Sequence, residues 1–433
     1  NGAYALTVNT SGATSFGGMV GATNMLTSLT TNAGGNTTLG GNITTSGAQA
    51  YNDAVTLGGN VTLTTAGSNV GFNSTVDNAS TTARNLVVNA GSGSVTFGGA
   101  VGSSVANGAL GALSVNSTGT TSFNGTVQAA SLATNAGGGT TLSGNVTTSG
   151  TQNYGDAMTL GANATLSGTT VSLAAVTGTG NNLTVTGNAV LAGVVSGVNA
   201  LQVSGTTNLN TASVSTSGGQ TYSGAVTLGV DTVLASSGSG TIGFGSTVNG
   251  AHALTANTGG ATSFGGAVGG TTALTSLTTD GGGSTMLGGN VTTSGAQAYN
   301  DAVTLGGNAT LATTNSNVSF NVTVDNASTT ARNLTVNAGT GAVTFSGAVG
   351  GSVANGALGA LSANSTGTTS FNSTVQAASL ATNAGGGTTL GGNVTTSGTQ
   401  TYGDAMTLGA NATLTGTTVS LAAVTGTGNN LTV

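Results

Sequence analysis

The chain has 433 residues and a net charge of −6 at pH 7, and only 2% of its residues are charged, against about 25% in an average soluble domain. It contains no Lys, Glu, Cys, Pro or Trp. This composition argues against nucleic acid as a partner, because phosphate binding requires clustered Lys or Arg. It also offers no run of about 18 apolar residues, so we expect no transmembrane segment.

Short stretches in which apolar and polar residues alternate follow one another along the chain. The first are LTVNT at Leu6, TTLGGNITT at Thr37, DAVTLGGNVTLTT at Asp53, NLVVNA at Asn85 and SVTFGGAV at Ser94. Such alternation, interrupted by Gly, Asn or Ser, is typical of β-strands joined by turns. Similar phrases recur every 20 to 24 residues, as in 26–47 and 48–69. The predicted fold class is all-β: a single elongated parallel β-helix, or β-solenoid, of about 20 coils of roughly 20–24 residues each.

The missing residue types support a solenoid. Each interior strand pairs on both sides and needs its N–H, which Pro lacks, whereas average usage would give roughly 20 prolines in this length. Like charges on successive coils would stack about 4.8 Å apart and repel each other. All nine phenylalanines precede Gly, Asn or Ser. We therefore predict that Phe16 and its eight counterparts point into the core.

A long tandem repeat organises the chain. Residues 1–185 align without a gap onto 249–433, at an offset of 248. We interpret 1–248 as the first unit and 249–433 as a second, truncated copy, together forming one continuous solenoid rod without separate globular domains. We expect either that the same polypeptide continues at both ends or that copies associate end to end.

Few residues are candidates for chemistry. His252 is the only histidine, and Tyr4 stands at its place in the first repeat, so we expect a surface or packing role. A Tyr-x-Asp phrase places a carboxylate at four equivalent positions: Asp53, Asp156, Asp301 and Asp404. We interpret these as acceptors that cap turns. The alternative is calcium binding, with Asp77 stacked near Asp53 and Asp280 near Asp301, although calcium prefers several carboxylates together.

The phrase VDNASTTAR occurs once in each long repeat, and each copy contains one of the two arginines of the chain. We predict that Asp77 pairs with Arg84, and Asp325 with Arg332, to hold one longer loop. The alternative is that this loop binds a receptor. We predict no catalytic, cofactor-binding or metal-binding residues and no cofactor, and we expect that the protein is not an enzyme.

The phrases TTSGAQAYNDAVTLGGNVTLT, LTVNAGTGAVTFSGAVG and ALTSLTTDGGGSTMLGGNVTTSGAQ resemble the repeat regions of large bacterial surface proteins, the filamentous-haemagglutinin-like and autotransporter-like adhesins. The resemblance implies a right-handed parallel β-helix, export from a bacterial cell, and an extracellular or cell-surface location. Its implied partners are a host cell, a neighbouring cell or a polysaccharide surface.

Three functions follow as hypotheses. The favoured one is a non-catalytic structural rod of an adhesin or surface fibre that can assemble into a filament. The second is a flat-faced, repetitive binding module for carbohydrate, mineral or ice. The least favoured is a β-helix enzyme acting on polysaccharide, because the eight aspartates are scattered.

Overall fold

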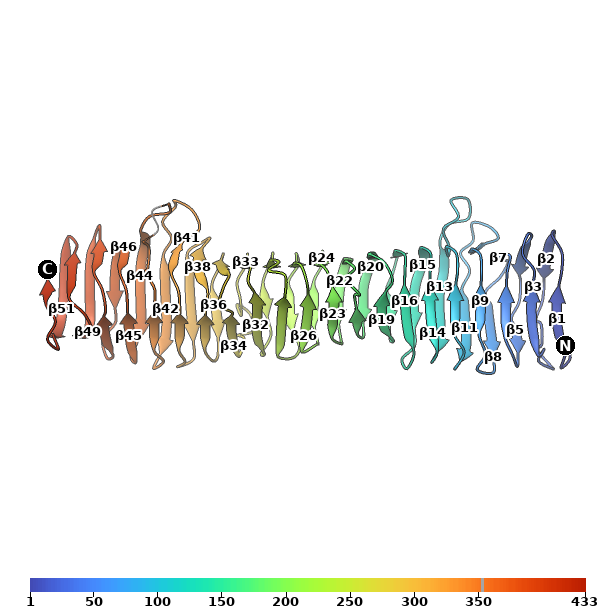
Figure 1. The fold of residues 1–433 in the computed structure, drawn as a ribbon, viewed down its shortest axis with the longest axis horizontal. Coiled ribbons are helices and arrows are strands. Elements are labelled where there is room, and N and C mark those ends of the chain that lie inside the picture. Colours follow the sequence, from blue (N-terminus) through green and yellow to red (C-terminus); the bar gives the residue numbers. More distant parts are fainter. Residues whose placement is uncertain (352–353) are drawn as a thin grey trace. The chain divides into compact units, whose positions relative to one another are not determined.

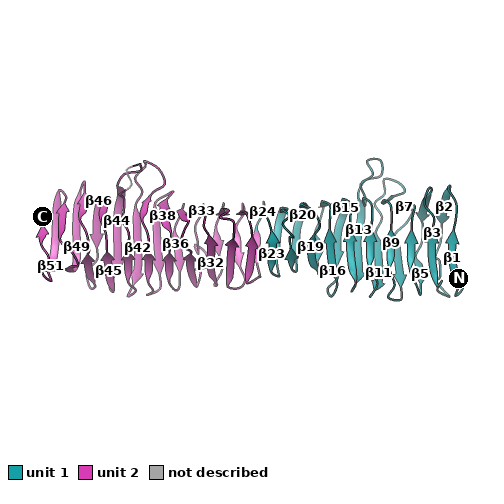
Figure 2. Ribbon diagram, in the orientation of Figure 1, with its two compact units in different colours: residues 1–206 teal, residues 207–433 magenta. Residues whose placement is uncertain are grey.

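The computed structural model describes residues 1–351 and 354–433. Its chain divides into two compact units, 1–206 and 207–433 (Figure 2). Both consist of β-strands and turns, and within the described residues there is no helix that could cross a membrane. The described residues make about 21 turns of a parallel β-solenoid, as the sequence predicts.

In unit 1, each coil contains two or three short strands, and each strand pairs with a strand two or three places further along the chain, as β1 does with β3 and β2 with β4 (Figure 1). Its strands are β1 (Ala5–Val8), β2 (Ala13–Phe16), β3 (Ser28–Thr31), β4 (Asn36–Leu39), β5 (Ile43–Thr45), β6 (Gln49–Tyr51), β7 (Ala54–Leu57), β8 (Val61–Thr65), β9 (Val70–Phe72), β10 (Val76–Asn78), β11 (Leu86–Gly91), β12 (Val95–Phe97), β13 (Leu110–Ser117), β14 (Thr120–Phe123), β15 (Val127–Thr134), β16 (Gly139–Leu142), β17 (Val146–Thr148), β18 (Gln152–Tyr154), β19 (Ala157–Leu160), β20 (Ala164–Leu173), β21 (Val176–Thr177), β22 (Leu183–Leu191), β23 (Val195–Val198) and β24 (Leu201–Val203).

Unit 2 is built in the same way. Its strands are β25 (Thr207–Leu209), β26 (Ser213–Thr216), β27 (Gln220–Tyr222), β28 (Val226–Leu228), β29 (Thr232–Ser236), β30 (Ile242–Phe244), β31 (Val248–Asn249), β32 (Ala253–Thr258), β33 (Ala261–Phe264), β34 (Ser276–Thr279), β35 (Ser284–Leu287), β36 (Val291–Thr293), β37 (Gln297–Tyr299), β38 (Ala302–Leu305), β39 (Ala309–Thr313), β40 (Val318–Phe320), β41 (Val324–Asn326), β42 (Leu334–Gly339), β43 (Val343–Phe345), β44 (Leu358–Ser365), β45 (Thr368–Phe371), β46 (Val375–Thr382), β47 (Gly387–Leu390), β48 (Val394–Thr396), β49 (Thr399–Leu408), β50 (Ala412–Thr415), β51 (Thr418–Thr425) and β52 (Leu431–Thr432).

The register shows how long each coil is. In unit 1 the separation between stacked residues ranges from 18, between Thr140 and Met158, to 27, between Leu86 and Leu113. The predicted range of 20–24 residues was therefore too narrow. The longer coils carry loops between their strands, whereas the strand pairing itself stays parallel, with one register shift between Asn89 and Gly91 where β11 pairs with β13.

The core consists of the alternate, inward-pointing residues of each strand, which are mostly Val, Leu, Phe and Tyr. Of the nine phenylalanines in the described chain, eight are buried, as predicted. The exception is Phe16, which is partly exposed and whose strand pairs with β4 alone. Phe16 therefore has a stacked neighbour, Leu39, on one side only.

A buried hydrogen-bonded clamp recurs wherever the sequence reads Gln-x-Tyr. In the first copy the Tyr51 hydroxyl donates to Gln49 Oε1 at 2.9 Å, and Gln49 Nε2 donates to the carbonyl oxygens of Ile43 and, in the next coil, Thr64, at 3.3 and 3.0 Å. Both side chains are at most 1% exposed. The amide therefore joins two coils from inside the core.

The other copies of the clamp repeat this geometry. Burial raises the pKa of all five clamp tyrosines, so each stays protonated and can donate. The remaining pairs are Gln152 with Tyr154, Gln220 with Tyr222, Gln297 with Tyr299 and Gln400 with Tyr402.

Asparagines hold the corners of the coils from outside. Asn60 Oδ1 accepts the backbone N–H of Asn85 at 3.0 Å, and Asn85 Oδ1 accepts that of Ala112 at 2.8 Å. Each amide thus satisfies a backbone donor of the following coil without adding charge. This neutral capping explains why a chain so rich in Asn needs few ionic contacts.

Candidate functional site

Each unit carries one pair of loops that projects from its regular coils (Figures 1 and 2). In unit 1 the first loop, 79–85, joins β10 to β11, and the second, 102–109, lies between β12 and β13. In unit 2 the equivalent loops are 327–333 and 350–357, of which 352–353 lie outside the described residues. We call each set the paired loops.

A buried asparagine joins the two loops of unit 1. Asn78, at the end of β10, is 0% exposed. Its Nδ2 donates to the carbonyl oxygens of Asn107, Gly108 and Ala109, at 3.4, 3.3 and 2.9 Å. In return, Asn107 Nδ2 donates to the carbonyl oxygen of Asn78 at 2.7 Å. The second loop is thereby held against the base of the first.

The same arrangement occurs in unit 2. Asn326 Nδ2 donates to the carbonyl oxygen of Ala357 at 3.0 Å, and Asn355 Nδ2 donates to that of Asn326 at 2.7 Å. Because both copies keep these bonds, the tie between the two loops is a duplicated feature. Sequence reasoning found the first loop through VDNASTTAR but missed the second, although the NGALGALS phrase after it also occurs twice.

The predicted ion pair between Asp77 and Arg84 was wrong. Among the described residues, Arg84 forms no ion pair. Asp77 Oδ1 instead accepts the backbone N–H of Ser104 at 3.0 Å, and the Arg84 N–H donates to Asn78 Oδ1 at 2.9 Å. The prediction rested on the short distance in sequence between Asp77 and Arg84. In the structure, the second loop instead brings the backbone N–H of Ser104 to the Asp77 carboxylate.

Aromatic stacks lie inside the coils that carry the paired loops. In unit 1, Tyr51, Phe72, Phe97 and Phe123 stack with ring centroids 5.2, 4.9 and 5.1 Å apart. The matching stack of unit 2 has spacings of 5.2, 4.8 and 5.1 Å and consists of Tyr299, Phe320, Phe345 and Phe371. A third stack, formed by Tyr222, Phe244 and Phe264, lies in coils without such loops, so aromatic stacking is not confined to the coils that carry them.

Three of the four Tyr-x-Asp carboxylates cap turns, as predicted. Asp53 Oδ1 accepts the backbone N–H of Gly35, one coil earlier, at 3.0 Å, and Asp53 Oδ2 accepts the Thr37 hydroxyl at 3.1 Å. Asp156 and Asp404 accept equivalent backbone bonds from Gly138 and Gly386, both at 2.8 Å.

Asp301 differs from the other three carboxylates in its hydrogen-bond donors. Its Oδ1 accepts hydrogen bonds from the hydroxyls of Thr279 and Thr285, at 2.9 and 2.8 Å. Burial raises the pKa of Asp301, which these two hydrogen bonds partly offset, and the nearby charge of Asp280 raises it further. In residues 1–351 and 354–433, no three His, Cys, Asp or Glu side chains gather as a metal site would require.

His252 lies on the surface of unit 2. Its Nδ1 is 3.4 Å from Asp231 Oδ1, and the two side chains are 37% and 74% exposed. The surface role predicted for His252 agrees with this position. Sequence reasoning did not identify Asp231 as its partner, because the two residues belong to neighbouring coils.

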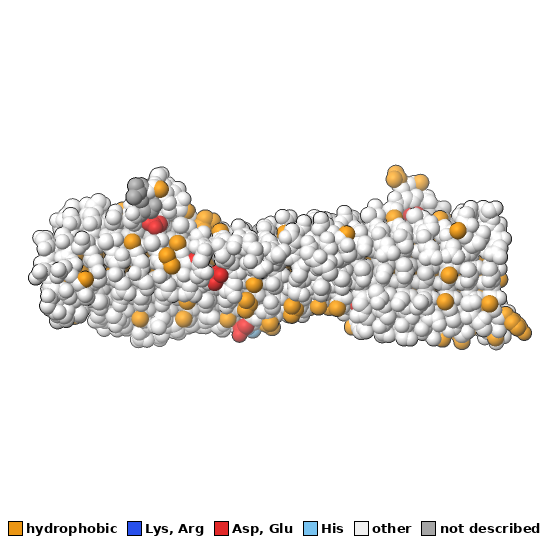
Figure 3. Space-filling view, in the orientation of Figure 1, with side chains coloured by type: hydrophobic (Ala, Val, Ile, Leu, Met, Phe, Trp, Pro, Cys, Tyr) orange, Lys and Arg blue, Asp and Glu red, His pale blue; other side chains and the backbone are white. Residues whose placement is uncertain are grey.

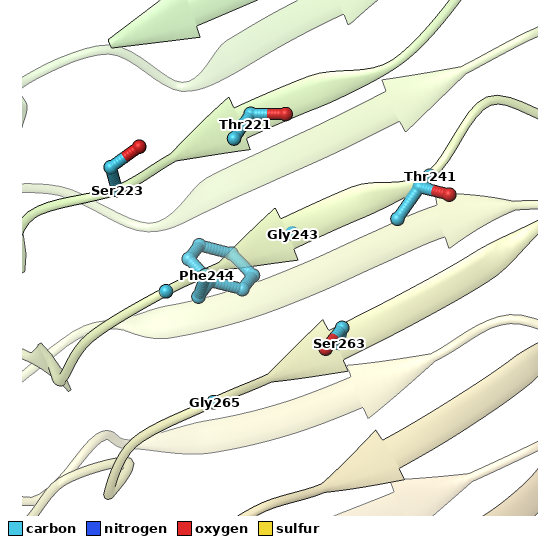
Figure 4. A pocket seen from close by; sticks show the side chains of 8 residues that line it. Thr221, Ser223, Thr241, Gly243, Phe244, Ser263 and Gly265 are labelled. Carbon is cyan, nitrogen blue, oxygen red and sulfur yellow. The ribbon is translucent and has the colours of Figure 1, made fainter. Parts of the chain in front are cut away.

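A shallow hollow of about 410 Å³ lies on a strand face of unit 2. Gly243 leaves a gap there, between the side chains of Thr221 and Ser263 on the neighbouring strands (Figure 4). The lining also includes Ser223, Thr241 and Phe244, and the hollow has no ionisable side chain. Such a surface can accept a neutral polar ligand but offers no general acid or base.

No family model, curated protein or solved structure matches this chain. The fold itself places it in the class of parallel β-solenoid repeat proteins. Figure 3 shows a face on which charged side chains are sparse, with apolar side chains at the end of the paired loops of unit 1. Val105, in the second loop of unit 1, is fully exposed.

Proposed function

We propose that this protein is a non-catalytic structural segment of a bacterial surface adhesin or fibre and that it works outside the cell. The observation that carries the proposal is the Gln-x-Tyr clamp, which at five places fastens one coil to the next through buried neutral groups. Because each coil depends mainly on its two neighbours, coils can be added without redesigning the core. The adhesin role rests on the resemblance of the repeated phrases to the repeat regions of bacterial surface adhesins.

Negative-stain electron microscopy of the purified chain tests the structural role. We expect unbranched particles a few nanometres wide, as stacked coils of this size require. Compact, rounded particles would contradict the proposal. Antibody labelling of intact producing cells tests the location, and labelling that requires cell lysis would count against a surface protein.

A second function, binding of a neutral carbohydrate, is favoured by the hollow at Gly243. Rows of small hydroxyl side chains run across successive coils on both units, for example Thr344, Ser370 and Thr389 in unit 2. The hydroxyls around the hollow could complement the hydroxyls of a sugar ring.

A matched pair of variants tests this second function on a glycan array. In Gly243→Leu the added side chain fills the hollow, where a Cβ would meet only ordinary contacts at 3.9 Å. Gly71→Leu makes the same change at an open position of unit 1. Binding that is lost in the first variant and kept in the second would support the carbohydrate function, whereas equal binding by both would exclude the hollow.

A further inference from the structure

The hollow on unit 2 is centred on a glycine that the fold does not require. Gly243 is the middle residue of β30, its φ is not positive, and an added Cβ would meet nothing closer than 3.9 Å. A glycine inside a strand weakens the strand, and it often marks a place where a ligand approaches the backbone closely. Backbone geometry does not explain this glycine, whereas close approach of a ligand would.

The hydroxyl groups around Gly243 are available to a ligand. Thr221 and Ser263 flank Gly243 in register on the two neighbouring strands, β27 and β33 (Figure 4). Ser223 and Thr241 complete the rim. Within residues 1–351 and 354–433, none of these four hydroxyls has a hydrogen-bond partner in the chain. The hollow is therefore bordered by donors and acceptors that the protein itself does not use.

The glycine also sets the spacing of the two flanking hydroxyls. In unit 1, Thr38 and Thr56 lie on adjacent strands, and their hydroxyls bond to each other at 3.0 Å. Thr221 and Ser263 are instead two strand spacings apart, about 10 Å, so they cannot bond to each other. The row thus has one hydroxyl at each end and an open floor between them.

The floor of the hollow lies over packed aromatic rings. Phe244 is 2% exposed and stacks between Tyr222 and Phe264, with ring centroids 5.5 and 5.1 Å apart. The three rings belong to the same three strands that line the hollow. Because this packing positions the strands before a ligand arrives, less ordering is needed on binding.

We propose that the hollow binds an extended, neutral, β-linked glucan of the cellulose type, with one sugar over Gly243 and its neighbours beside Thr221 and Ser263. This inference rests on the carbohydrate function proposed above and names the class of sugar. The lining has no ionisable side chain, which suits an uncharged ligand. Such a glucan is a flat ribbon whose sugars follow one another at nearly the strand spacing of about 4.8 Å, so three sugars match three strands. An α-linked glucan of the amylose type curves away from a flat face.

Unit 1 supplies a comparison within the same chain. Gly71 is also an open strand glycine, where an added Cβ would meet nothing closer than 3.8 Å. Its neighbours in the row are Ala50 on one side and Thr96 on the other. A hydroxyl on one side only cannot hold sugars at both ends, so we expect no equivalent site at Gly71.

Isothermal titration calorimetry of the full chain with cello-oligosaccharides tests the proposal. We expect cellotriose to bind, whereas cellobiose, which cannot reach both flanking hydroxyls, should bind roughly 10-fold more weakly. Thr221→Val and Ser263→Ala should each weaken cellotriose binding about 5-fold, as expected for the loss of one neutral hydrogen bond. Thr96→Val removes a hydroxyl beside Gly71 and should leave cellotriose binding unchanged. Circular dichroism of each variant checks that the fold is kept.

Maltotriose tests the shape of the ligand, because it has the same three sugars in α linkage, and it should bind roughly 10-fold more weakly than cellotriose. The proposal is overturned if maltotriose or cellobiose binds as tightly as cellotriose, or if Thr221→Val and Thr96→Val have equal effects. In those cases the chain still binds a neutral carbohydrate. If cellotriose fails at millimolar concentration while the glycan array finds another neutral sugar, this inference fails and the carbohydrate function stands. If no neutral sugar binds in either assay, both fail.

Discussion

The clamp formed by Gln49 and Tyr51 gives the sharpest test of how the coils are held together. In Gln49→Leu the Tyr51 hydroxyl loses its acceptor inside the core, and the bond to the Thr64 carbonyl oxygen disappears. An unsatisfied buried donor costs about 1–3 kcal/mol and the lost bond about 1 kcal/mol, so the free energy of unfolding should fall by about 2–4 kcal/mol.

The complementary change, Tyr51→Phe, leaves Gln49 Oε1 without its donor and should cost about 1–3 kcal/mol. The double variant removes both partners, so no unpaired group remains in that bond. Its cost should therefore be smaller than the sum of the single costs by about 1–2 kcal/mol. Urea unfolding followed by circular dichroism measures all three values.

The reasoning would be refuted if the two single costs added to within about 0.5 kcal/mol, because contacting residues that share a bond should couple. It would also fail if Gln49→Leu cost less than about 0.5 kcal/mol, the usual range for a surface substitution. The clamp of Gln152 and Tyr154 repeats the geometry and allows the same cycle at a second place.

Three further predictions concern the caps, the loops and the aromatic stacks. Burial raises the pKa of Asp301 above its ordinary value of 3.8, so its contribution to stability is present below that value and is lost as pH rises through the higher folded pKa. Urea unfolding should thus show stability falling over this window, and Asp301→Asn should flatten the slope; an unchanged slope would contradict the assignment. Asn78→Ala should release the paired loops of unit 1 and speed trypsin cleavage after Arg84 about tenfold, while cleavage after Arg332 in the same chain serves as the control. Equal acceleration at both arginines would indicate general unfolding instead. Phe97→Ala removes the ring between Phe72 and Phe123 and should cost about 3–5 kcal/mol in urea unfolding, and a cost under about 1 kcal/mol would show that the stack does not support these coils.

The sequence by itself determined the fold class, because strand alternation, glycine and asparagine corners and the lack of proline are local properties. It also determined the inward phenylalanines and the capping role of Asp53, since a repeated phrase places each residue at a repeated corner. The sequence does not by itself show which residues contact one another across neighbouring coils. Residues stacked on successive coils of unit 1 are 18–27 residues apart, and small changes in coil length decide which of several similar phrases meet.

Only the tertiary structure therefore decided that Asp77 meets Ser104 and not Arg84, and that Asn78 ties together two loops lying in different coils. It also showed that Gln49 reaches the next coil from inside the core. The physical reason is that a periodic chain carries nearly the same signal in every coil. Partners in neighbouring coils are fixed by stacking register, and register depends on the exact length of each coil, including its loops.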